Sequence, residues 1–108
     1  MTVIGSYLDS PAATATVRRA VPKSFAAIRA CRNGGALRRL LETTMVDAIV
    51  LGVRAANAVD VERLRRTFPA VPVVIFGPIR PDHAAVVRGL HERGVAAVMV
   101  EGVDDPVV

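Results

Sequence analysis

The stretch Asp47-Ala48-Ile49-Val50-Leu51-Gly52-Val53 decides the fold class of this chain. Residues 48–53 form a short apolar run that does not alternate with polar positions. A run of this length and composition is typical of a strand that is buried on both faces, as in the middle of a parallel sheet. The sequence therefore predicts a central parallel strand at this point of the chain.

Further apolar runs flank this strand and alternate with segments of helical periodicity. The runs predict strands at residues 2–7, 24–30, 71–76 and 95–100. Apolar side chains at spacings of three and four predict helices at residues 12–20, 36–43, 60–68 and 81–94, and Asn33-Gly34-Gly35 predicts a turn. This alternation favours an α/β fold: a doubly wound, five-stranded parallel sheet with flavodoxin-like strand order 2-1-3-4-5. Because only seven residues follow Glu101, we expect the final helix of that plan to be absent or truncated.

Length and composition favour one cytoplasmic domain. The 108 residues fit a single domain covering residues 1–108, and 52% hydrophobic residues are enough for a packed core. The apolar runs are far shorter than the roughly 20 residues that a bilayer span needs, so we expect no membrane segment. The start of the chain has no basic segment ahead of an apolar one, which argues against a signal peptide. The single cysteine, Cys31, forms no intramolecular disulfide, which suits a reducing compartment.

The net charge of +4 is unevenly distributed along the chain. Residues 1–54 hold 8 basic and 3 acidic residues, whereas the remainder holds 6 and 7. A basic surface attracts nucleic acid weakly. Only 4% of the residues are aromatic, and no helix-turn-helix pattern is present. We therefore expect DNA contact only through an effector segment outside this chain.

From Asp47 onward the order of segments resembles a response-regulator receiver domain of the CheY-like type. Residues 47–52 resemble the strand that carries the phospho-accepting aspartate, and residues 61–66 resemble the helix after its loop. Residues 72–77 resemble the fourth strand, and residues 88–97 resemble the helix and the Gly-Ala turn before the fifth. The resemblance covers residues 24–102 and, more loosely, the first strand. It implies a flavodoxin-like fold and a role in two-component signal transduction, often ahead of a DNA-binding domain in a bacterial transcription regulator.

The metal-binding positions of receivers are not retained. Receivers place two acidic residues after the first strand to hold magnesium, and the matching positions are Tyr7 and Leu8. Asp9 is the only carboxylate nearby. Since a hard divalent cation requires several oxygen ligands, a single carboxylate does not make a dedicated magnesium site. We expect neither a metal nor a cofactor here.

The phosphorylation positions are also altered. The resemblance places the phospho-accepting aspartate at Gly52 and the hydroxyl switch residue at Gly77. It places the switch aromatic at Val98 and the phosphate-binding lysine at Glu101. Gly52 has no nucleophile, and Glu101 repels a phosphoryl group. The sequence therefore predicts a degenerate receiver, or pseudoreceiver, that is not an enzyme and regulates without phosphorylation.

Such a module is expected to act through protein contacts. The resemblance implies a protein partner or a homodimer, bound through the face formed by the fourth helix and the fifth strand. The candidates on this face are Arg88, His91, Glu92 and Arg93, although each is also typical of a solvated helix surface. No membrane partner is expected.

Two alternatives remain open. Cys31 precedes a glycine-containing loop, as in small α/β phosphatases and sulfurtransferases, but their Cys-x5-Arg pattern requires an arginine where this chain has Leu37. Gly52 and Gly77 leave room for a small ligand, which suggests a ligand sensor, or else a pocket that has collapsed.

His83 and His91 lie eight residues apart without other ligands nearby, which argues against a metal site.

Overall fold

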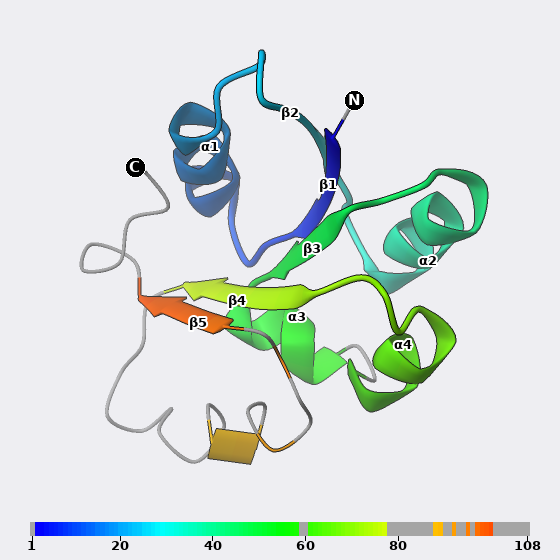
Figure 1. The fold of residues 1–108 in the computed structure, drawn as a ribbon. Helices are drawn as coiled ribbons and strands as arrows, with labels where there is room; N and C mark the ends of the chain where they lie inside the picture. The colour runs from blue at the N-terminus through cyan, green and yellow to red at the C-terminus, as the bar shows by residue number, and fades with distance from the viewer. Residues whose placement is uncertain are drawn as a thin grey trace.

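The computed structural model describes residues 2–58, 61–77, 88, 89, 92, 95 and 97–100. Its strands are β1 (Thr2–Tyr7), β2 (Ala26–Ala30), β3 (Ala48–Leu51), β4 (Val73–Gly77) and β5 (Ala97–Val100). They form one parallel sheet in the order β2-β1-β3-β4-β5, which confirms the predicted topology (Figure 1). Ile4 of β1 pairs with Ile28 on one side and Ala48 on the other, so β1 lies inside the sheet and β2 at its edge.

Helices cover both faces of this sheet. They are α1 (Pro11–Ala20), α2 (Gly34–Thr43), α3 (Val53–Ala58) and α4 (Val61–Thr67). Figure 1 shows α1 on one face and α2, α3 and α4 on the other. In the described ranges, every helix is too short or too polar to cross a membrane.

Two apolar clusters hold these layers together. Among the described residues, the α1-face cluster consists of Ala13, Val17 and Phe76. The larger α2-face cluster contains residues from α2, α3, α4, the sheet and the segments before β3 and β5: Leu37, Leu41, Val46, Ile49, Leu51, Val53, Ala56, Val61, Val73, Ile75 and Val95. Because side chains alternate along a strand, Ile49 and Leu51 face α2 while Val50 packs on the α1 side. β3 is therefore buried on both faces, as its apolar run predicts.

At three predicted boundaries, a local hydrogen bond moves the start of a helix or a strand. Asn33 is not part of a turn: its Oδ1 accepts a hydrogen bond from Ala36 N (2.8 Å), so α2 begins at Gly34. The second strand begins at Ala26 because Phe25 N and Ala26 N both donate to Pro22 O in a turn. The fourth begins at Val73 because Val71 N donates to Phe68 O.

The end of the central strand also differs from the prediction. β3 stops at Leu51 rather than residue 53, and the short helix α3 follows at once. Ala56 N donates to Gly52 O (2.8 Å), which is the first helical hydrogen bond of α3. Of the predicted helix at residues 81–94, only residues 88, 89 and 92 are described, and all three are helical. The predicted end of this helix at residue 94 and the expected absence of a final helix lie outside the described residues.

Candidate functional site

The predicted site positions meet at the carboxyl-terminal edge of the sheet. Tyr7 ends β1 and pairs with Leu51, the last residue of β3. Gly52 follows β3 and donates its N–H to Tyr7 O (2.9 Å), while Gly77 ends β4. In doubly wound parallel sheets, this edge is where ligands bind. The register therefore brings these positions together where a functional site is expected.

Asp9 lies across this edge and caps α3. Its Oδ2 accepts a hydrogen bond from Arg54 N (3.1 Å), and its Oδ1 accepts one from Ala55 N (3.0 Å). Both N–H groups belong to the first turn of the helix, where no helical carbonyl is available to them. The carboxylate also carries the charge that the positive end of a helix favours. Asp9 thus joins the β1–α1 loop to the segment after β3.

Asp9 leaves no room for a side chain at Gly52. A Cβ atom on Gly52 would overlap Asp9 Oδ1 and would lie 2.7 Å from Asp9 N. Because the second of these atoms belongs to the backbone, a rotamer change of Asp9 would not remove the overlap. With the β1–α1 loop in its present position, only glycine fits at position 52.

The neighbouring position, Gly77, is also enclosed. A Cβ atom there would lie 3.4 Å from Val53 Cγ2 and 3.9 Å from Asp9 Oδ2, both within ordinary contact distance. Gly52 and Gly77 are themselves buried. Asp9 and Val53 thus fill the space beside the two glycines, and this packing disfavours a ligand-sensing cavity between them.

The other described positions matched to the phosphorylation site carry no charged side chain. Tyr7 is half-buried against the α2-face cluster, and Leu8 packs against the α1-face cluster. Val98 is half-buried and also packs on the α2-face cluster, whereas Glu101 lies outside the described residues. Among the described residues, no three His, Cys, Asp or Glu side chains come together to hold a metal ion. Asp9 is therefore the carboxylate that the structure places at this edge, and its two oxygens already accept hydrogen bonds.

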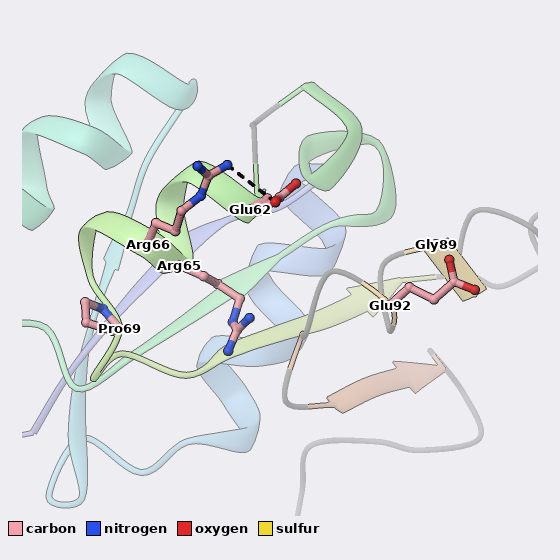
Figure 2. A pocket seen from close by; sticks show the side chains of 6 residues that line it. All are labelled: Glu62, Arg65, Arg66, Pro69, Gly89 and Glu92. Atoms are coloured by element: carbon pink, nitrogen blue, oxygen red, sulfur yellow. Dashed lines mark ion pairs between the residues drawn. The ribbon is translucent and has the colours of Figure 1, made fainter.

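The candidates for a protein-contact face are described only in part. Arg88 and Glu92 are exposed, while His91 and Arg93 lie outside the described residues. A hollow beside α4 is lined by Glu62, Arg65, Arg66, Pro69, Gly89 and Glu92 (Figure 2). Within it, Arg66 Nη2 lies 3.4 Å from Glu62 Oε1. This pair is exposed and therefore contributes little to stability, and the hollow presents charges of both signs.

Cys31 does not have the surroundings of a catalytic thiol. Burial raises the pKa of the Cys31 thiol, which favours the unreactive protonated form. The Sγ atom lies 3.8 Å from Arg29 O, to which it donates a weak hydrogen bond. Leu37 is buried in the core, and Arg38 pairs with Glu42 at 3.4 Å. No phosphate-binding cradle of the Cys-x5-Arg type forms around this loop.

We expect slow alkylation of Cys31 at neutral pH. With its pKa raised by burial, less of the thiol is ionised than in an unfolded chain, so iodoacetamide should react more slowly with the native protein than with the unfolded protein. The rate is measured by mass spectrometry for native protein and for protein in denaturing urea, with free cysteine in each buffer as the control. A faster reaction of the native protein would restore the thiol-enzyme hypothesis.

Comparison with solved structures shows which known proteins share this fold. No protein-family model matches the chain, and no curated protein matches it. A response regulator from Thermotoga maritima superimposes with a TM-score of 0.77 at 16% identity, over 94% of this chain and 87% of that one. The signal receiver domain of an HD domain-containing protein from Pseudomonas fluorescens Pf-5 gives 0.79 at 12% identity, over 96% and 78%.

A longer protein also contains this fold. RcsB from Salmonella enterica serovar Typhimurium, in a structure bound to promoter rprA with the phosphomimetic BeF3−, gives a TM-score of 0.76 at 10% identity. The match covers 94% of this chain but only 60% of the RcsB chain. The resemblance seen in the sequence is thereby confirmed for the fold. With its parallel sheet in the order β2-β1-β3-β4-β5 and helices on both faces, the chain has the fold of a response-regulator receiver domain.

Proposed function

We propose that this chain is a receiver-like regulatory module that acts through protein contacts and does not use an aspartyl phosphate. The observation that carries the proposal is the position of Asp9 over Gly52. Phosphoryl transfer to an aspartate needs a carboxylate at the end of β3 and a divalent cation beside it. Here the end of β3 has no side chain, and the carboxylate from the β1–α1 loop occupies the space that such a side chain would need.

Asp9 is a poor substitute for the missing acceptor. Both of its oxygens accept hydrogen bonds from backbone N–H groups of α3, which stabilise the negative charge and lower the nucleophilicity of the carboxylate. Phosphorylation of Asp9 would also break the cap of α3. These contacts favour a carboxylate with a structural role that joins two loops at the sheet edge.

The site is tested with beryllofluoride and magnesium, which mimic an aspartyl phosphate. We expect no saturable change in the amide NMR signals of Asp9, Gly52 and Gly77, because the carboxylate set that this mimic requires is missing. Acetyl phosphate should likewise add no phosphoryl group detectable by mass spectrometry. A receiver domain that keeps its aspartate serves as the positive control. Saturable shifts at Gly52 and Gly77, or a phosphorylated Asp9, would contradict the proposal.

Partner binding is proposed for the face that includes Arg88, His91, Glu92, Arg93 and β5. The exposure of Arg88 and Glu92 supports it. DNA binding is proposed only for an effector segment outside this chain, by analogy with RcsB, whose structure was obtained bound to a promoter. A cytoplasmic location fits this role.

Two observations disfavour the alternative functions. The raised pKa of Cys31 disfavours a thiol enzyme, and the filled space beside Gly52 disfavours a ligand sensor.

A further inference from the structure

The open edge of the sheet at β2 carries a basic groove. β2 is the first strand in the sheet order and pairs only with β1 among the described strands, so the backbone groups on its outer side are not used by the sheet. A groove runs along this side between α1 and α2. Its residues include Arg18 from α1, Arg29 from β2 and Arg39 from α2. We call it the β2-edge groove.

The three arginines are exposed and unpaired. In the described part of the chain, Arg18, Arg29 and Arg39 form no ion pair, in contrast to Arg38 and Arg66, which do. Ile28 packs on the α1 side of the sheet, so the alternation of β2 directs Arg29 to the α2 side, toward Arg39. Arg18 lies on the α1 side. The groove is therefore positively charged on both of its walls.

A second hollow continues the groove toward the carboxyl-terminal edge of the sheet. It shares Ala30 and Cys31 with the first and adds Arg32 and Ser10. Of the described residues lining the two hollows, only Asp9 is acidic, and its carboxylate already accepts hydrogen bonds from the backbone of α3. The combined surface therefore has four guanidinium groups available to an anionic ligand.

We propose that the β2-edge groove binds an extended acidic segment of a partner protein. An added strand forms main-chain hydrogen bonds with the open edge of a sheet, and its alternate side chains enter the flanking pockets. Glutamate or aspartate side chains at alternate positions would then reach Arg29 and Arg39 on the α2 side, and an acidic residue at an intervening position would reach Arg18 on the α1 side. Arginine forms especially favourable paired hydrogen bonds with carboxylates. This inference is independent of the proposed function, because it concerns a different edge of the sheet.

A protein segment fits this groove better than a nucleic acid does. Single-stranded nucleic acids bind to basic grooves that also offer aromatic side chains for base stacking. The residues that the structure describes around the two hollows include no aromatic side chain. A nucleic acid also lacks the regularly spaced backbone N–H and C=O groups that match a strand edge. The open edge and the arginines together therefore favour a polypeptide.

Binding is tested with a short fluorescent peptide of alternating glutamate and threonine, titrated by polarisation. We expect Arg29→Glu to weaken binding by about tenfold or more. Arg19→Glu, which changes the same charge on an exposed residue of α1 outside the groove, should weaken it by no more than about twofold. Thermal unfolding of both variants verifies that they remain folded. Amide NMR signals of Arg29 and Ala30 should shift on binding.

Two further probes distinguish the binding modes. A peptide of the same sequence with N-methylated backbone amides should bind weakly, since it cannot pair with β2, and a lysine-threonine peptide should not bind. Equal losses for Arg29→Glu and Arg19→Glu, or the absence of binding by the acidic peptide, would overturn the proposal. Tighter binding of a single-stranded oligonucleotide than of the peptide would also overturn it and assign the groove to nucleic acid.

Discussion

Gly52→Ala is expected to lower the free energy of unfolding by about 3 kcal/mol, a cost typical of forcing an extra methyl group into a packed site. The new Cβ would overlap the carboxylate of Asp9 and approach its backbone nitrogen to 2.7 Å. The β1–α1 loop would have to move, and this movement would break the hydrogen bonds from Asp9 to Arg54 N and Ala55 N. The change is measured by urea unfolding, with the slope of the transition checked for two-state behaviour.

Gly89→Ala is the matched control for this substitution. A Cβ at Gly89 meets nothing within 4 Å, and residue 89 is helical, so alanine there should be neutral or stabilising by up to about 1 kcal/mol. In an Asp9→Gly background, Gly52→Ala should lower the free energy of unfolding by a smaller amount, because part of the overlap involves the Asp9 side chain. If Gly52→Ala were as stable as Gly89→Ala, the β1–α1 loop would not be held against Gly52. The structural argument against an aspartate at position 52 would then be lost.

The sheet follows from the sequence because strands and crossovers have local signals. The apolar run at residues 48–53 requires burial on both faces, and helices between strands require parallel connections. These two constraints, together with the resemblance, were enough for the strand order that the structure has. The turn predicted at Asn33 has an ambiguous signal, since asparagine is also a preferred helix N-cap. The hydrogen bond to Ala36 N decides between the two.

The contacts of the site have no such local signal. Asp9 caps a helix that begins more than forty residues later, and only the pairing of Tyr7 with Leu51 brings the two segments together. The sequence therefore indicates which groups are missing at Gly52 and Gly77 but not what fills their place. The β2-edge groove was also missed. The excess of basic residues in the first half of the chain is its only sequence signal, and Arg18, Arg29 and Arg39 converge only once β2 lies at the sheet edge.

Phe76→Ala is expected to be the most destabilising substitution considered, at about 4 kcal/mol, as is usual when a buried aromatic side chain is removed from a core. Phe76 is 1% exposed and is the largest fully buried side chain among the residues that the structure describes. It packs with Ala13 and Val17 in the small α1-face cluster. Because Ala13 and Val17 have small side chains, these two neighbours cannot fill the cavity that the ring would leave. Removal of the Phe76 ring should therefore weaken the packing of α1 against the sheet.

Phe25→Ala is the control for this prediction, because the same atoms are removed from a side chain that is 67% exposed. We expect it to change the free energy of unfolding by no more than about 0.5 kcal/mol. Both variants are compared by urea unfolding, and amide hydrogen exchange reports separately on α1. In Phe76→Ala, exchange should accelerate more in α1 than in α2, whose Leu37 and Leu41 are anchored in the other cluster. Equal acceleration in both helices would mean that the two faces of the sheet unfold as one unit, and that α1 does not depend on its own cluster for its position.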